Sequence, residues 1–389
     1  MPERTRSISL TLISLVVSIC LALAGLEIYL RLTSEGKVKP YAGIGIIPEI
    51  TDACFEQGFL VYYAGLKGSF ISSYDPELGW DFEVASDRTR GDRATGSKSR
   101  ETVRVIALGD SFTWGTEVED HETYPFHLEK TLTEVRRRPA EVLNMGVGGY
   151  GIDQALLKYL RHGKPLRPDL VILGIFPHDY DRSRLTFFTY SKPLFRFDHA
   201  SGAYTLGNVP VPPPDEMFET LSRKYDGTVS YAFIAVRNRL LQLFHYVLSP
   251  SDPNGYYSST DRLVEYLLTR LRDEQDKAQA GFFIVHIPQG DFFASDQMLS
   301  KGRKEEQTVR LKRIYEKLKI PCLDLFEEFP RRFPLRTIHE EFYARGPHGA
   351  TGHFSPRGNA EVAKIIAEHL EAGNLLRNSN DKTSVQAAR

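Results

Sequence analysis

Short apolar runs alternate with amphipathic segments from residue 102 onward. The apolar runs predict buried strands at 102–108, 141–145, 170–176, 281–287 and 320–325. Apolar residues at helical spacing between and after them predict helices at 124–135, 152–163, 261–279, 305–318 and 359–373. Continuous apolar strands that alternate with helices are typical of a parallel sheet covered on both faces. The pattern therefore predicts an α/β domain over residues 101–372.

A long insert interrupts this alternation between the third and fourth strands. About a hundred residues separate the two strands, far more than a simple crossover needs. Residues 192–214 predict a hairpin that turns at 199–202 and is followed by prolines. Residues 231–248 predict a helix with a wide apolar face, either packed as a cap or docked on a membrane surface. We expect this insert, 182–260, to wall the pocket and set the substrate.

The N-terminal segment differs from the rest of the chain. Residues 8–26 carry no charge, and in a helix they span about 28 Å, close to the thickness of a hydrocarbon core. Basic residues flank both sides, so charge does not fix the orientation, but the short N-terminal tail favours export. Residues 1–31 therefore predict either a membrane anchor, through residues 8–30, or a cleaved signal peptide. In both cases we expect the main domain outside the cytoplasm, in a bacterial periplasm or cell envelope.

Polar segments border the α/β domain. Residues 32–100 form a lead-in rich in glycine, serine and charge, in which 86–101 predicts an exposed loop. Residues 373–389 predict a disordered tail. Of the three cysteines, Cys54 and Cys322 could pair in an exported domain. The strand-like surroundings of Cys322 instead favour a buried free thiol.

Overall charge excludes one class of partner. Lys and Arg total 49 against 50 for Asp and Glu, which gives a formal net charge of −1 at pH 7. A nucleic-acid-binding protein normally shows a basic excess, so we expect no nucleic-acid partner. Oligomeric state is left open.

Polar residues follow the predicted strands at the edge of the sheet where ligands bind in open α/β folds. Gly109–Ser111 follows the first strand, NMGVGGYG (144–151) the second and His178 the third, while His353 precedes the last helix. A serine hydroxyl becomes a good nucleophile when a base takes its proton, and histidine titrates near neutral pH. Backbone N–H groups at a helix start or in a glycine loop can hold an oxyanion. These groups are expected to meet at one edge of the sheet.

Three motifs carry a resemblance to a known family. GDSFTWG (109–115), NMGVGGYG (144–151) and HFSPRGN (353–359), in this order, resemble the SGNH (GDSL-type) hydrolase superfamily. The lead-in PELGW (76–80) is similar to that of the membrane-anchored bacterial members, and the likeness covers roughly residues 75–370. The resemblance implies the flavodoxin-like fold of that superfamily, a three-layer α/β/α sandwich with a five-stranded parallel sheet. To this fold the insert adds a hairpin-plus-helix cap.

The resemblance also implies residue roles. Ser111 is the nucleophile and His353 the general base, and the N–H groups of Ser111 and Gly149 contribute to the oxyanion hole together with His178. The implied reaction proceeds through an acyl-enzyme, without a cofactor or a metal.

The chain departs from the family pattern at two places. The family carries asparagine at the position of His178, whose imidazole can still donate a hydrogen bond. The family also carries an aspartate two or three residues before the base, where this chain has Thr351 and Ala350. Other groups must then orient the imidazole. The candidates are a main-chain carbonyl, Thr351, and the side chains of His348, Glu340 and Glu341.

We therefore expect an extracytoplasmic serine esterase that acts on an ester, such as an O-acylated glycan or lipid. If a sugar hydroxyl replaces water, the same site becomes an O-acyltransferase on an envelope polysaccharide. A non-catalytic binding protein of the same fold and a membrane-docking, lipid-handling protein are further alternatives.

Overall fold

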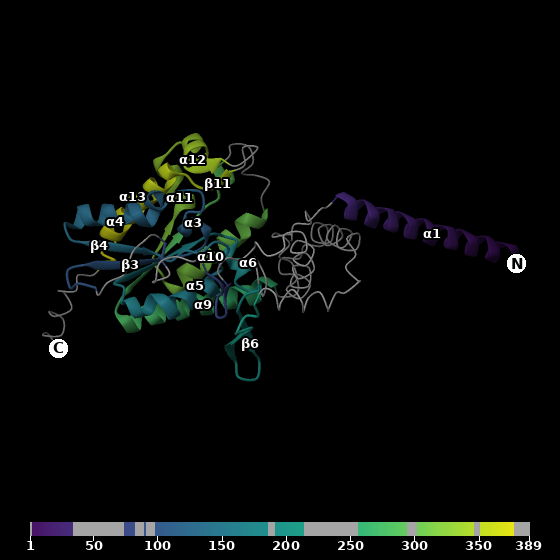
Figure 1. Cartoon of the computed structure of the whole chain (residues 1–389), viewed down its shortest axis with the longest axis horizontal. Coiled ribbons are helices and arrows are strands. Elements are labelled where there is room, and N and C mark those ends of the chain that lie inside the picture. Colours follow the sequence, from purple (N-terminus) through teal and green to yellow (C-terminus); the bar gives the residue numbers. More distant parts are fainter. Residues whose placement is uncertain are drawn as a thin grey trace. The chain divides into compact units, whose positions relative to one another are not determined.

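The computed structural model of the chain describes residues 2–33, 74–81, 89–90, 98–185, 191–213, 256–293, 302–345 and 351–376. The chain divides into two compact units, Met1–Tyr74 with Pro212–Tyr256 and Asp75–Val211 with Tyr257–Arg389. In the first unit, α1 (Pro2–Thr33) is a continuous helix, drawn in purple in Figure 1. Its stretch Leu12–Tyr29 is long and apolar enough to cross a membrane, a property that a signal sequence shares.

A five-stranded parallel sheet forms the centre of the second unit (Figure 1). Its strands are β3 (Val103–Leu108), β4 (Ala140–Asn144), β5 (Leu170–Ile175), β8 (Gly281–His286) and β9 (Cys322–Asp324). Their spatial order is β4-β3-β5-β8-β9, and every neighbouring pair is parallel. Numbered along the chain, this is the flavodoxin-like order in which the first strand lies between the second and the third. The predicted strands are confirmed.

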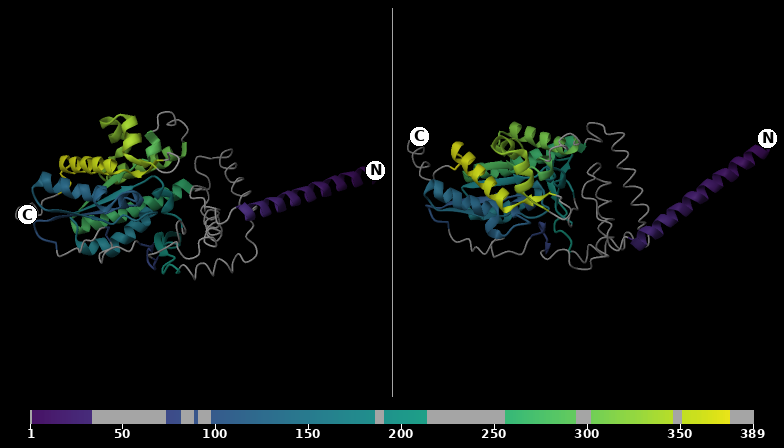
Figure 2. Two further views of the ribbon diagram at one scale, coloured as in Figure 1. Left: turned by 45° about the horizontal axis from the view of Figure 1, so that its top comes forward. Right: turned by 90° about the horizontal axis from the view of Figure 1, so that it is seen from above.

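Helices cover both faces of the sheet (Figures 1 and 2). One face packs against α4 (Tyr124–Arg136), α11 (Leu325–Arg332) and α13 (Pro356–Ala372). The other packs against α5 (Ile152–Lys158), α9 (Tyr256–Ala278) and α10 (Gly302–Leu318). Alternate residues of each strand enter the two cores, because successive side chains of a strand point to opposite faces. The predicted three-layer α/β/α sandwich is confirmed.

Short elements surround the sheet. In the described part of the chain these include three two-stranded sheets. They are β1 (Tyr74–Asp75) with β2 (Gly79–Trp80), β6 (Leu194–Asp198) with β7 (Ala203–Gly207), and β10 (Tyr343–Arg345) with β11 (Thr351–Phe354). The single-turn or short helices are α3 (Ser111–Trp114), α6 (Asp179–Arg182) and α12 (Leu335–Glu341). Short turns of 3-10 or π helix occur at Asp120–Glu122, Tyr159–Gly163, Lys164–Leu166 and Gly290–Phe293.

The hairpin predicted within the insert is β6–β7, with its turn at residues 199–202, and this prediction is confirmed. The helix predicted at 231–248 lies outside the described residues, as does Cys54. Cys322 is a free thiol, and burial raises its pKa.

The prediction of an exposed loop over 86–101 is wrong at Thr89 and Arg90. Thr89 is fully buried, and the Arg90 side chain is 11% exposed because it packs against the segment that follows Ser111. Nearby, the buried Asp81 pairs with Lys158 of α5 at 2.7 Å between Oδ1 and Nζ. Residues 75–81 and 89–90 of the lead-in therefore pack with the α/β domain.

Candidate active site

Ser111 begins α3 directly after β3, at the carboxyl edge of the sheet. Asp110 caps this single turn by accepting a hydrogen bond from the Phe112 N–H at 2.9 Å. Gly115, with φ +80°, ends the turn, and its N–H donates to the Ser111 carbonyl. Strand, cap and left-handed glycine together hold the Ser111 side chain at the strand end.

Arg182 of α6 contacts this turn through its cap, Asp110. Its Nη1 lies 3.0 Å from Asp110 Oδ2 and 2.8 Å from Asp179 Oδ1, and both carboxylates are buried. Burial and the neighbouring Asp110 carboxylate raise the pKa of Asp179. Asp179 also accepts the Phe176 N–H at 2.9 Å. Asp110 and Asp179 therefore fix the turns after β3 and β5.

The glycine-rich loop after β4 lies against the α3 turn, which begins at Ser111. Asn144 donates from Nδ2 to the Thr113 carbonyl at 2.8 Å, which ties β4 to α3. On its other side, Trp80 of the lead-in donates from Nε1 to the Gly148 carbonyl at 3.0 Å. The Tyr150 hydroxyl in turn donates to the Trp80 carbonyl at 2.5 Å. Gly149, between these anchors, has φ +83°, a conformation that L side chains rarely adopt.

Two of the predicted oxyanion donors present open N–H groups. Among the described residues, no backbone carbonyl accepts a hydrogen bond from the N–H of Ser111 or of Gly149. The third predicted donor, His178, lies between β5 and α6, and its ring stacks on Phe176 with centroids 5.1 Å apart. Phe112 contacts both Phe176 and His353, so a series of ring contacts connects His178 with His353.

His353 reaches Ser111 from the β10–β11 hairpin. Its Nε2 lies 2.7 Å from Ser111 Oγ, although 242 residues separate the two along the chain. Ser111 Oγ is also 3.5 Å from Asp110 Oδ2, so the contact with the imidazole is the shorter one. Asn359 of α13 secures the hairpin by donating from Nδ2 to the carbonyls of Phe354 and Ser355. The structure thus brings together the two residues that the motifs single out.

The carboxylate nearest to His353 Nδ1 among the described residues belongs to Glu117. Glu117 Oε1 lies 3.4 Å from Nδ1, and Oε2 accepts the His353 backbone N–H at 2.8 Å. The candidates from the sequence lie elsewhere. Glu341 pairs with Arg357, and Glu340 pairs with Arg336 at 3.0 Å. His348 and the side chain of Thr351 are outside the described part of the chain.

The sequence analysis therefore missed Glu117 and also Arg90. Arg90 donates to the carbonyls of Trp114, Gly115 and Val118 and pairs with Asp120. The available signal was the acidic segment TEVEDHE (116–122), which directly follows the motif GDSFTWG (109–115). A search confined to the neighbours of His353 in sequence could not find it.

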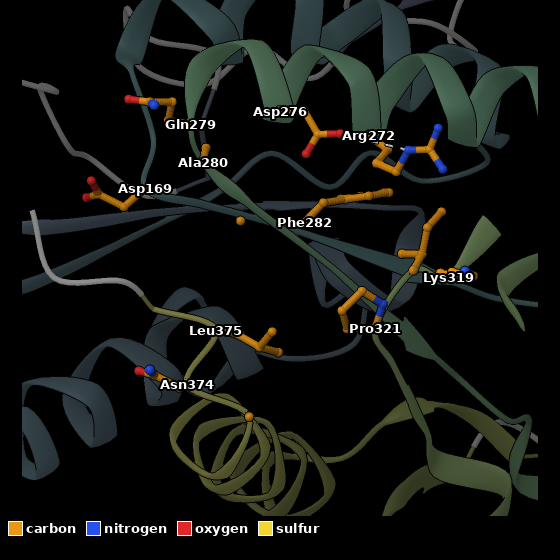
Figure 3. A pocket seen from close by; sticks show the side chains of 13 residues that line it. Asp169, Arg272, Asp276, Gln279, Ala280, Phe282, Lys319, Pro321, Asn374 and Leu375 are labelled. Carbon is orange, nitrogen blue, oxygen red and sulfur yellow. Dashed lines mark ion pairs between the residues drawn. The ribbon is translucent and has the colours of Figure 1, made fainter. Parts of the chain in front are cut away.

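A cavity of about 470 Å³ lies at the opposite edge of the sheet (Figure 3). Its lining includes Asp169 before β5, Gly281 at the start of β8 and Pro321 before β9. Strand starts define the amino edge, whereas Ser111 follows the carboxyl end of β3. The cavity shares no residue with the predicted site.

Comparison with known proteins finds no matching family model and no matching curated protein. Among solved structures, the chain is similar to a putative lipolytic protein of the G-D-S-L family from Desulfitobacterium hafniense DCB-2, with 11% identity over 69% of this chain and 99% of that chain and a TM-score of 0.39. It is also similar to the acetylxylan esterase Axe2 from Geobacillus stearothermophilus (11% identity, 70% and 96% covered, TM-score 0.38). A third is a lipase/acylhydrolase from Enterococcus faecalis (12% identity, 69% and 96% covered, TM-score 0.39). At these TM-scores no reaction or substrate is carried over to this chain. The G-D-S-L family is also the one that the three sequence motifs resemble.

Proposed function

We propose that the chain is a serine ester hydrolase in which Ser111 is the nucleophile and His353 the general base. The observation that carries this proposal is the 2.7 Å contact between Ser111 Oγ and His353 Nε2. A hydroxyl within hydrogen-bond reach of an imidazole can lose its proton as it attacks, which turns a weak nucleophile into an effective one.

The reaction balances with these two residues and water. The Ser111 proton moves to His353 Nε2 while Oγ forms a bond to the ester carbonyl carbon. The tetrahedral intermediate collapses, and the leaving alkoxide takes the proton from Nε2. Water then attacks the acyl-enzyme in the same way, with Nε2 first accepting and then returning a proton, and the released acid leaves Ser111 free.

The open N–H groups of Ser111 and Gly149 support the second requirement of this chemistry, which is stabilisation of the oxyanion. Neither N–H is taken by a described backbone carbonyl, so both can bind the developing charge. In this proposal His178, whose ring stacks on Phe176, is the third donor. The hydrogen bond from Trp80 to Gly148 holds the loop that carries Gly149.

The proposed substrate is an ester outside the cytoplasm, such as an O-acyl group of a glycan or lipid. The helix α1 supports this location, because as an anchor or a signal it would direct the domain to the cell envelope. Residues 194–207 of the insert form a hairpin whose Phe197 and Leu206 are exposed, which suits a wall for an acylated ligand.

The test is covalent labelling with a fluorophosphonate probe, together with hydrolysis of p-nitrophenyl acetate. Labelling of the full chain that maps to Ser111 and is lost in Ser111→Ala supports the proposal. Ser99→Ala, at an exposed serine before β3, is the matched control and should label normally. A folded protein that neither labels nor hydrolyses the ester contradicts the proposal and favours a binding protein. Acyl transfer to an added sugar that outpaces release of free acid would identify a transferase.

A further inference from the structure

We propose that Glu117 is the positioning residue that orients His353, in place of a carboxylate close to the base in sequence. The inference rests on the proposed function, because it concerns the same imidazole. In this proposal the acid lies six residues after Ser111, in the segment that follows the nucleophile. It does not lie in the segment that carries His353.

The two ring nitrogens of His353 face two different partners. Nε2 faces Ser111 Oγ at 2.7 Å, and Nδ1 faces Glu117 Oε1 at 3.4 Å. Ser111 can donate to Nε2 only when the ring proton is on Nδ1. A carboxylate beside Nδ1 favours that tautomer and stabilises the imidazolium that forms as Ser111 attacks.

The contact at Nδ1 is close but not aligned. Nδ1 is buried and makes no hydrogen bond of good geometry with any described residue. Catalytic hydrogen bonds are often long before substrate binds and shorten in the reacting complex. The carboxylate itself is held, because its other oxygen accepts the His353 backbone N–H at 2.8 Å. A small rotation about this anchor would bring Oε1 into line with Nδ1.

Gly352 provides the space for this carboxylate. A Cβ at residue 352 would lie 2.5 Å from Glu117 Oε1 and closer still to Oε2. Any side chain at residue 352 would therefore displace the Glu117 carboxylate from β11. An acid from a distant segment can therefore approach His353 here because the residue before the histidine is a glycine.

Arg90 fixes the backbone on both sides of Glu117. It donates to the carbonyls of Gly115 at 2.5 Å and Val118 at 2.6 Å, and its Nε lies 2.5 Å from Asp120 Oδ1. Its guanidinium also lies over the Trp114 ring, 4.8 Å from the centroid. Since the Glu117 side chain is 37% exposed, its position depends on these backbone anchors rather than on burial.

Glu117→Gln separates orientation of the ring from simple support of β11. The Gln carbonyl oxygen can still accept the His353 backbone N–H, so a purely structural role would survive the change. The amide NH₂ would then face Nδ1 and favour the tautomer with the proton on Nε2, which cannot accept the Ser111 proton.

The experiment compares Glu117→Gln, Gly352→Ala and the double variant with the wild type, and uses Glu134→Gln on the exposed side of α4 as the control. Fluorophosphonate labelling at neutral pH should slow by about 10- to 1000-fold in Glu117→Gln and in Gly352→Ala. The double variant should be no slower than the slower single variant, because both changes remove the same contact. Glu134→Gln should match the wild type.

A second readout does not depend on turnover. ¹⁵N NMR of the imidazole, assigned to His353 by its loss in His353→Asn, reports which ring nitrogen carries the proton. We expect Nδ1–H in the wild type and a shift toward Nε2–H in Glu117→Gln. Labelling within twofold of the wild type in Glu117→Gln, or an unchanged tautomer, overturns the proposal for Glu117 even if the chain is an esterase. A wild type without ester chemistry but with the expected tautomer change would overturn the proposed function alone.

Discussion

The Lys192 ammonium group lies 2.5 Å from Asp153 Oδ2, and both side chains are fully buried. Lys192 precedes β6, and Asp153 lies in the first turn of α5, just after the glycine-rich loop. Lys192 Nζ also donates to the Arg182 carbonyl at 2.7 Å. One buried ammonium therefore connects the β6–β7 hairpin to the two segments that support the site.

Lys192→Met should destabilise the fold by about 3–5 kcal/mol, because it leaves Asp153 buried without its counter-charge. Burial already raises the pKa of Asp153, although Lys192 opposes the shift, and removal of Lys192 raises it further. The folded variant then holds a proton that the unfolded chain has released, so its loss of stability should shrink as the pH falls from 8 to 5.

Urea denaturation at the two pH values measures this effect. Lys317→Met is the control, since Lys317 pairs with Glu265 on the surface, where we expect a change of less than about 1 kcal/mol. Equal losses in the two variants would show that burial of the Lys192 pair is unimportant.

Asn359→Leu should both destabilise the fold and slow labelling at Ser111. Besides the bonds to Phe354 and Ser355, Asn359 accepts the Tyr124 N–H at 2.9 Å, and its side chain is fully buried. Leucine leaves these backbone groups unpaired, which costs about 2–4 kcal/mol and loosens the hairpin next to His353. Thermal unfolding and labelling rates measure the two effects. Lys364→Ala, on the exposed side of α13, should change neither, and a normal labelling rate in Asn359→Leu would contradict the link to His353.

Trp80→Phe should slow labelling at Ser111 clearly, while the free energy of unfolding changes less. Phenylalanine retains most of the ring but cannot donate to the Gly148 carbonyl, so the loop that carries Gly149 loses an anchor. Loss of one hydrogen bond corresponds to a rate decrease of about 3- to 30-fold. Glu134→Gln, on the exposed side of α4, serves as the control. An unchanged rate in a folded Trp80→Phe variant would show that the lead-in does not position the loop.

Acid stability should depend on His286. Its ring is fully buried at the end of β8 between Tyr315 and Phe326, and burial, with a smaller effect of Lys312, lowers its pKa to about 3. The nearby Asp324, 3.7 Å away, therefore faces a neutral imidazole at neutral pH. The unfolded chain, with a His pKa near 6.5, binds a proton that the folded chain excludes. Stability is then lost as the pH falls from about 6.5 toward 3.

His286→Leu removes this proton uptake. Between pH 7 and pH 5 the wild type should lose about 2 kcal/mol more of its unfolding free energy than the variant does. Burial raises the pKa of Asp324, which acts in the opposite direction at lower pH, so the comparison is made above pH 5. Parallel urea-denaturation curves at the two pH values would refute a neutral buried imidazole.

The sequence predicts the main sheet well because its strands are buried on both faces and read as continuous apolar runs. Two short helices, α11 and α12, are not predicted. The helix α11 begins directly where β9 ends, so its start is hidden in the apolar run at 320–325, and it contains Pro330, a residue that normally ends a helix. The local apolar pattern predicts the long strands and helices. It does not predict a helix that begins directly at the end of a strand.

The motifs locate Ser111 and His353 but not the groups around them. Arg90 lies in a polar segment, and its burial depends on distant groups: it donates to the carbonyls of Gly115 and Val118 and pairs with Asp120. Glu117 meets His353 across 236 residues because the β10–β11 hairpin folds onto the α3 turn. No spacing rule along the chain encodes such a contact.

The contact between Gly352 and Glu117 also links the N-terminal and C-terminal segments of the site in evolution. The proposed nucleophile Ser111 and the proposed acid Glu117 lie within seven consecutive residues, whereas the proposed base His353 lies far along the chain on β11. If related chains exchanged their C-terminal segments, the new segment would bring a histidine but no acid. Glu117 could contact that histidine only if a glycine preceded it in the sequence. A glycine at the position of Gly352 is thus the condition under which two related chains could exchange their C-terminal segments and keep this contact.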